Sequence, residues 1–275
     1  MPGVRVKHVL VYSTVDPASV NIARVVKALL GLSKEEVVKG YKLLMRDSDV
    51  ALLEIGDELV HADYIERIVE AELAVFLSRH EASARLPSLT VHVPGNWTNE
   101  AKLGGLPGKL CIAPAVPMLA ALKVLERERG DYGLSNWLCS YEATHHGPYL
   151  EKTPAFFIEI GSTREEWTNT RAAELVAQAV VEALKARGSE AFIGIGGPHY
   201  APKLTLYALK NNAAIGHIAP RYVLDEISPE NLAYAIVRTR EQIVGVVVDW
   251  KGTRKTQRER LLPWLEKKGI RVFRA

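Results

Sequence analysis

The stretch "AAELVAQAVVEALKARGSEAFIGIGGPHYAPK", residues 172–203, decides the fold class, because a helix, a buried strand and a glycine turn follow one another within it. Ala172, Leu175 and Ala179 recur at helical spacing. Residues 191–195 form a short apolar run that is typical of a strand. The glycine turn leads into a further helix that starts near a proline. A helix followed by a buried strand and another helix is the pattern of an α/β protein.

The same alternation runs along the rest of the chain. Helices between short apolar strands predict a three-layer α/β/α sandwich with a mixed, mostly parallel sheet, in a single domain that spans residues 1–275. No internal repeat interrupts it. The expected strands lie near residues 9–12, 51–55, 73–77, 89–93, 137–144, 155–160 and 243–248, and the expected helices near 18–30, 117–129, 165–187 and 229–240.

Composition sets further bounds. The 275 residues, 48% of them hydrophobic and 24% charged, suffice for a large core, and a net charge of +3 does not by itself indicate a nucleic-acid binder. Cys111 and Cys139 form no metal or disulfide motif, which favours a reducing compartment. The apolar run at residues 111–122 is shorter than the about 20 residues of a membrane span. We therefore expect a cytoplasmic monomer with no membrane contact and no obligate protein partner.

Histidines mark the ends of the expected strands. In open α/β sheets ligands bind where strands end, so a group of imidazoles there predicts a site. A single histidine at a strand end is usually structural, but the shared placement of these residues favours a functional role. They are His80, His92, His145, His146, His199 and His217.

Two glutamates accompany these histidines. If residues 141–144 are extended, Glu142 and His146 share one face while His145 faces the other way. A carboxylate beside an imidazole orients a base or supports a metal ligand, although such a pair can also merely close a strand. Glu159 lies within the apolar "FFIEIGS", where a carboxylate is costly unless it is paired or at a solvent-facing edge.

The glycine turn "GIGGPHYAPK" is the third element. Gly194, Gly196 and Gly197 allow close backbone approach, and the helix that follows offers N–H groups to an anion. The turn fails the dinucleotide fingerprint, because His199 stands where the last glycine should be. No serine-nucleophile motif occurs in the chain. Histidines and carboxylates without a nucleophile indicate water activation, by a general base or by a metal such as zinc.

Taken together, these motifs resemble the D-aminoacyl-tRNA deacylase family of the archaeal and plant type over most of the chain. The resemblance implies hydrolysis of the ester that joins a D-amino acid to the 3′-terminal ribose of tRNA, a step of translation quality control. It also implies a phosphorylase/hydrolase-like fold and a link with zinc. The motifs that carry it are "SRH", "LTVHVPGNW", "LGGLPG", "EATHHGP", "FFIEIGSTREEW", "GIGGPHYAPK" and "GHIAPRY".

Ester hydrolysis needs a positioned water, a base and donors for the oxyanion. We expect His146 or His80 to activate the water, directly or through zinc, with Glu142 or Glu159 orienting that group. The turn at Gly194, Gly196 and Gly197, with His199, would hold the oxyanion or the terminal adenosine. The resemblance does not fix the zinc ligands, for which the candidates are His80, His92, His145, His146 and Glu159.

A tRNA substrate also needs a phosphate-binding surface. The basic C-terminal segment with Arg254, Lys255 and Arg258 suits the acceptor stem, although such a run is often only a solvated face. Lys102 and Lys109 could instead guide the CCA end. Two other functions stay open: a zinc-dependent peptidase or amidase for small substrates, and a non-catalytic nucleotide- or RNA-binding module that leaves the histidines unexplained.

Overall fold

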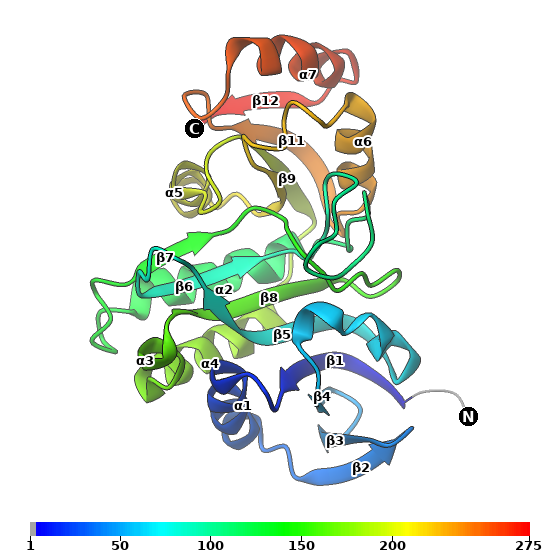
Figure 1. The fold of residues 1–275 in the computed structure, drawn as a ribbon, viewed down its shortest axis with the longest axis vertical. Helices are drawn as coiled ribbons and strands as arrows, with labels where there is room; N and C mark the ends of the chain where they lie inside the picture. The colour runs from blue at the N-terminus through cyan, green and yellow to red at the C-terminus, as the bar shows by residue number, and fades with distance from the viewer. Residues whose placement is uncertain (1–3) are drawn as a thin grey trace.

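The computed structural model describes residues 4–275, and within them the strands form two sheets (Figure 1). The larger sheet has eight strands in the order β2-β3-β4-β1-β5-β8-β6-β7, and the smaller has four in the order β10-β9-β11-β12. The strands are β1 (Val4–Ser13), β2 (Lys34–Val38), β3 (Tyr41–Arg46), β4 (Val50–Ile55), β5 (Val69–Glu81), β6 (Ser88–His92), β7 (Leu138–Tyr141), β8 (Ala155–Ser162), β9 (Glu190–Ile195), β10 (Ile215–Ala219), β11 (Gln242–Val248) and β12 (Arg271–Arg274).

The helices cover both sheets. Helix α4 packs between α1 and α2, and all three contact strands of the larger sheet. Helix α2 also contacts β9 and β10 of the smaller sheet. Helices α6 and α7 pack over the smaller sheet at the top of Figure 1. The helices are α1 (Pro17–Leu30), α2 (Ala115–Glu128), α3 (Arg164–Trp167), α4 (Thr170–Lys185), α5 (Pro202–Asn211), α6 (Pro229–Val237) and α7 (Lys255–Lys267), with short 3-10 helices η1 (Leu59–His61) and η2 (Asp63–Arg67).

The predicted α/β fold with mixed, mostly parallel strands flanked by helices is confirmed. Strand β1 pairs in parallel with β4 and β5, and the whole smaller sheet is parallel. Two features were not predicted. The strands are divided between two sheets, and the hairpin β2-β3 went unrecognised because "KEEVV" in β2 is mostly exposed and polar. The assignment of residues 1–275 to a single domain stays a prediction.

The predicted helix over residues 165–187 is wrong, because the chain forms two helices there. Thr163 and Glu166 make reciprocal capping bonds at the start of α3. Asn169 then caps α4, its side-chain oxygen accepting the N–H of Ala172 at 3.0 Å. A residue that caps a helix has non-helical backbone angles, so Asn169 separates the two helices.

Both cysteines are buried and free, as predicted. Burial raises the pKa of the Cys111 thiol to about 12, so it acts as a small apolar residue. Within residues 4–275 no helix has the length and apolar character that crossing a membrane requires.

The order of three central strands brings polar side chains together. Strand β8 lies between β5 and β6, so Glu159 is interior and only 2% exposed, which rules out a solvent-facing edge. The register pairs His80 with Gly161 and His92 with Phe157. Because alternate residues of β8 share a face, His80, His92 and Glu159 project to the same side of the sheet.

Candidate functional site

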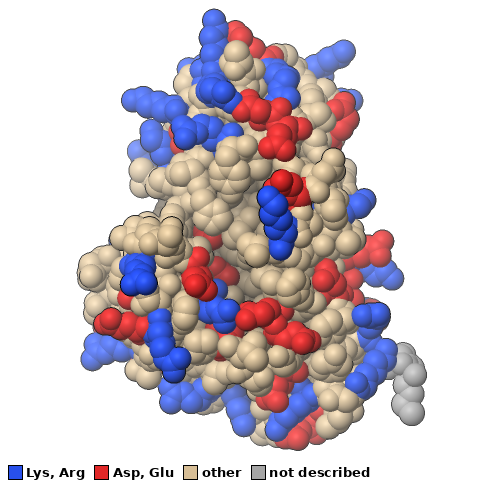
Figure 2. Space-filling model, in the orientation of Figure 1, with Lys and Arg blue, Asp and Glu red and all other residues tan. Residues whose placement is uncertain are grey.

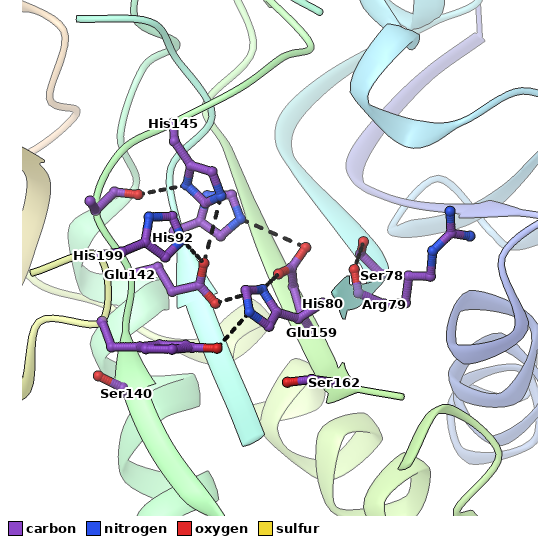
Figure 3. Close-up of polar contacts among 12 residues, drawn as sticks. Ser78, Arg79, His80, His92, Ser140, Glu142, His145, Glu159, Ser162 and His199 are labelled. Atoms are coloured by element: carbon purple, nitrogen blue, oxygen red, sulfur yellow. Dashed lines mark hydrogen bonds and ion pairs between the residues drawn. The ribbon is translucent and has the colours of Figure 1, made fainter. Parts of the chain in front are cut away.

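The polar side chains at this face form one group, which we call the histidine cluster. Strands β5, β6 and β8 supply His80, His92 and Glu159, and the segment that follows β7 supplies Glu142, His145 and His146, while His199 follows β9. Ion pairs and ring contacts connect its members. Figure 3 shows His80 between the two carboxylates, with His145 and His199 beside Glu142. The cluster consists of His80, His92, Glu142, His145, His146, Glu159 and His199.

His80 is held as a cation. Its Nδ1 lies 3.3 Å from Glu159 Oε2 and 3.1 Å from Glu142 Oε1, and its Nε2 lies 2.7 Å from the hydroxyl of Tyr200. Burial disfavours the imidazolium, but the hydrogen bond to Glu159 and the charges of both glutamates outweigh it and raise the pKa of His80 to about 9. Gly161 makes room for the ring, since a Cβ there would lie 3.0 Å from the His80 side chain.

Both carboxylates are buried in their charged form. Burial alone would raise the pKa of Glu159, but the hydrogen bond from His80 and the nearby His92, whose Nε2 lies 3.7 Å from Glu159 Oε1, lower it below its usual range. Glu142 Oε2 accepts a hydrogen bond from His199 Nε2 at 2.9 Å. This bond and the charge of His80 hold the pKa of Glu142 below its usual value despite burial. Among residues 4–275, Oε1 of Glu142 finds no partner in hydrogen-bonding geometry.

The remaining cluster histidines offer free ring nitrogens. Nδ1 of His145 lies 2.8 Å from the carbonyl of Ala143, and Nδ1 of His146 lies 2.5 Å from that of Gly147. A carbonyl only accepts, so both Nδ1 atoms carry the proton and both Nε2 atoms keep a lone pair. Burial and the charge of His92 lower the pKa of both imidazoles, that of His146 to about 4. His92 likewise donates from Nδ1, to the carbonyl of Val93.

These three imidazoles fit a zinc site. His92, His145 and His146 place one ring nitrogen each within 4.8 Å of one another. Imidazoles whose other nitrogen donates to a carbonyl are common zinc ligands, and His92, whose pKa Glu159 raises despite burial, would release a proton on binding zinc. Nε2 of His92 is buried and has no hydrogen-bond partner among the described residues, which a metal would satisfy. Two comparable groups include Glu142. One comprises Glu142, His145 and His199, and the other comprises His80, Glu142 and Glu159.

The loop at residues 95–109 packs against the turn that carries these histidines. Gly104 has a φ of +76° and lies against the backbone of Val60, where a Cβ would overlap the carbonyl oxygen. Gly147 lies against the same carbonyl and against Gly105. The Gly147 N–H also donates to the carbonyl of Leu103 at 2.9 Å. Backbone-to-backbone contacts therefore fix the loop to the residue that follows His146.

The predicted alternation after Tyr141 is wrong. Strand β7 ends at Tyr141, and His146 has a φ of +45°, so the segment is not extended. As a result His145 lies beside Glu142, their Nε2 and Oε2 atoms being 3.6 Å apart. His146 instead packs against the ring of Phe157.

Other predicted residues lie outside the cluster. His217 is buried in β10, where it contacts Thr144 and the carbonyl of Arg238. The amides of Gly196 and Gly197 already donate to backbone carbonyls, and the position of Gly194 packs on core side chains, so the structure offers no free oxyanion donors there.

The predicted basic residues have different surroundings. Lys109 lies over the ring of Tyr234, and Arg258 donates to the carbonyls of Trp250 and Thr253. Lys102 pairs with a neighbouring glutamate at the surface, and Arg254 and Lys255 are exposed. A role of any of them in tRNA binding stays a prediction.

Sequence reasoning missed two residues that support the cluster. Tyr200 bonds His80, and only its place directly after His199 could have indicated it. Asp16 lies just before the helix expected near residues 18–30 and was given no role in the site. Its carboxylate accepts the N–H of Ser19 at 3.0 Å and that of Arg79 at 2.8 Å, and so ties α1 to the residue before His80.

Comparisons with known proteins agree on one family. A sequence profile described as D-aminoacyl-tRNA deacylase matches residues 68–273. A D-aminoacyl-tRNA deacylase of Thermococcus kodakarensis is 39% identical over 97% of this chain and 99% of its own length. One of Methanocaldococcus jannaschii is 32% identical over 96% of this chain and 98% of its own. A crystal structure of a conserved protein of unknown function has a TM-score of 0.88 at 30% identity, covering 100% of this chain and 96% of the other.

Proposed function

This chain belongs to the D-aminoacyl-tRNA deacylase family, and from that premise we propose that the histidine cluster is its hydrolytic site. The reaction cleaves the ester of D-aminoacyl-tRNA to a free D-amino acid and tRNA, a proofreading step of translation. The observation that carries the proposal is the meeting of a cationic His80, two buried carboxylates and neutral imidazoles at one strand end. A peptidase for small substrates and a non-catalytic RNA-binding module are not retained.

His199 is our choice of general base. Its Nε2–H donates to Glu142, so Nδ1, which lies 3.3 Å from the hydroxyl of Tyr222, keeps the lone pair and can take a proton from a water molecule that reaches it. A buried carboxylate that accepts from one nitrogen of an imidazole fixes the tautomer and stabilises the imidazolium that forms. The imidazole of His199 is partly exposed, so water can reach it.

His80 is our choice of proton donor. It is an imidazolium near neutral pH, because Glu142 and Glu159 stabilise the charge. Its Nε2–H donates to the hydroxyl of Tyr200, and His80 itself lines a cavity beside the cluster. A cation there stabilises the charge that develops on the ester oxygens and can protonate the departing ribose oxygen.

We further propose that His92, His145 and His146 hold zinc. When bound, the ion would polarise an ester carbonyl or lower the pKa of a water molecule. Support comes from their carbonyl-bonded Nδ1 atoms, their proximity and the unpaired Nε2 of His92. Since the substrate is a translation intermediate, we place the activity in the cytoplasm.

The first test measures hydrolysis of matched D- and L-tyrosyl-tRNA. The variants His80→Gln and His199→Asn should each lower kcat by about 10²- to 10⁴-fold on the D-ester, the usual contribution of a general acid or base. His8→Gln, outside the cluster, is the matched control. Wild-type rates in both folded cluster variants would refute the site.

The second test concerns the metal. We expect chelation to stop D-ester hydrolysis and added zinc to restore it, with bound zinc measured at each stage. Full activity in protein shown to be metal-free would refute the zinc proposal, while leaving the His199 and His80 assignments intact.

A further inference from the structure

Two cavities meet at the histidine cluster. The first, of about 330 Å³, is lined by the loop at residues 95–103 and by Tyr222, and we call it the Tyr222 cavity. The second, of about 490 Å³, is lined by Asp16, residues 58–61 and residues 78–81, and we call it the Asp16 cavity. Both are lined by Leu103, His145 and His146. If a ligand places one group in each cavity, the bond that joins these groups therefore lies beside the histidine cluster.

The Tyr222 cavity presents a fixed aromatic face. Tyr222 is 55% exposed, which is unusual for so large a side chain, and its hydroxyl lies 3.3 Å from His199 Nδ1. Trp97 lines the same cavity and is held by a hydrogen bond from its indole N–H to the carbonyl of Ile218. The charged groups of this cavity are Glu226 and the pair of Glu100 and Lys102, which lie 3.0 Å apart. A tethered, exposed aromatic ring is a stacking surface for a nucleobase.

Cations continue beyond Tyr222. Tyr222 also lines a neighbouring cavity of about 300 Å³, together with Arg221, Asp225 and Arg254. Within residues 4–275 Arg221 has no ion-pair partner, and Arg254, whose side chain is 61% exposed, pairs with Asp225. Figure 2 shows Lys and Arg gathered over the upper part of this face, where α7 lies in Figure 1, above a central hollow. Guanidinium groups at the surface suit phosphates.

The Asp16 cavity is richer in carboxylates, with four, including Glu159, against the two of the Tyr222 cavity. Asp16, Glu58 and Glu81 line it, and its single arginine, Arg79, is bound to Glu58 at 3.1 Å. Carboxylates disfavour a phosphate backbone. Val60 and Leu103, both partly accessible, supply apolar surface that suits an amino-acid side chain.

We propose that the two cavities hold different parts of the substrate. The 3′-terminal nucleoside of tRNA occupies the Tyr222 cavity, with its base stacked on Tyr222 and the preceding phosphate at Arg221 and Arg254. The aminoacyl group occupies the Asp16 cavity. The inference rests on the proposed function of the cluster. The orientation of the substrate across the two cavities follows from its covalent structure, because the tRNA extends from only one side of the ester. That side must carry cations, and of the two cavities only the Tyr222 cavity leads to unpaired arginine.

The nucleoside half is tested by steady-state kinetics on D-tyrosyl-tRNA. Tyr222→Ala should raise KM roughly 5- to 150-fold, the range for loss of one base–aromatic stack. Tyr222→Phe keeps the ring, so its KM should stay near the wild-type value, and any fall in kcat reports the lost contact with His199. An equal rise in KM for both variants, or none for Tyr222→Ala, would overturn the assignment.

The phosphate contacts are tested by salt dependence. The double variant Arg221→Ala, Arg254→Ala should flatten the slope of log(kcat/KM) against log salt by up to about 1, since the one phosphate that both arginines contact contributes roughly 0.7 to 0.9. Tyr222→Ala should leave the slope unchanged, as should Lys27→Ala, an exposed lysine on α1. A wild-type slope in the double variant would refute phosphate binding there.

The aminoacyl half is tested with two substrates that share the tRNA end. Val60 lines the Asp16 cavity, so Val60→Phe should lower kcat/KM for D-tyrosyl-tRNA more than for D-alanyl-tRNA. Tyr222→Ala should affect both substrates equally. The reverse pattern would overturn the division. Failure of wild-type enzyme to cleave either ester would instead refute the proposed function itself.

Discussion

Replacing Gly104 by alanine should separate the loop from the histidine turn. A Cβ at Gly104 would overlap the Val60 carbonyl oxygen and lie 2.8 Å from its carbon, whereas carbon atoms pack at about 3.5–4.0 Å. The loop must therefore move by about 1 Å, and Leu103, whose carbonyl holds Gly147, must move with it. A displacement of this size at a catalytic site costs about 100-fold. We expect kcat/KM on D-tyrosyl-tRNA to fall by about that factor in Gly104→Ala.

Gly108→Ala is the matched control. Gly108 belongs to the same loop and has a φ of +64°, but the nearest atom to its Cβ would be Asn99 Oδ1 at 3.9 Å. Both variants bear the backbone cost of about 1–2 kcal/mol for a left-handed alanine, so the comparison isolates the contact with Val60. Thermal unfolding establishes that both variants fold. Equal activity of the two variants would show that the loop does not position the cluster.

Three further predictions concern metal, pH and folding. His145→Ala should lose bound zinc relative to wild type, measured by elemental analysis of folded protein; undiminished zinc would show that His145 is not a ligand. Burial, with the charges of Lys7 and Arg187, lowers the pKa of His8 to about 4, so on acidification the unfolded chain takes up a proton first. Between pH 6.5 and 4 the free energy of unfolding of wild type should then fall by up to about 3 kcal/mol relative to that of His8→Gln, measured by denaturant titration at each pH. The same pH dependence in both proteins would contradict this. Glu66→Ala leaves the N–H groups of residues 151–153 without their acceptor and should cost about 3 kcal/mol, whereas a loss below 1 kcal/mol would mean that water replaces the carboxylate.

Apolar periodicity predicted most of the fold, because strands buried on both faces have continuous apolar sequences. Strand β4 follows this rule, and helix α1, expected near residues 18–30, spans Pro17–Leu30. Periodicity does not specify which strands pair. Strand β6 pairs antiparallel with β8, and β9 belongs to the second sheet. Both arrangements depend on contacts between residues that are distant in the sequence.

The same limit applies to the site. Glu159 was recognisable because a carboxylate in an apolar strand requires a partner, but its partner His80 follows from strand order. His217 has the same sequence setting as the cluster histidines, yet it belongs to β10 in the other sheet. Tyr222 entered only as the last residue of "GHIAPRY" and was given no role, since only the surface of the folded chain shows that its ring is exposed.

The partition formed by Leu103, His145 and His146 bears on how the enzyme distinguishes mirror images. If the ester carbonyl lies at the partition and the side chain extends into the Asp16 cavity, two of the four bonds of the α-carbon have fixed directions. Exchanging the D-isomer for the L-isomer then only interchanges the hydrogen and the amino group. Stereospecificity would need no recognition of the side chain itself, and a single obstruction beside the α-carbon would suffice for every amino acid that fits.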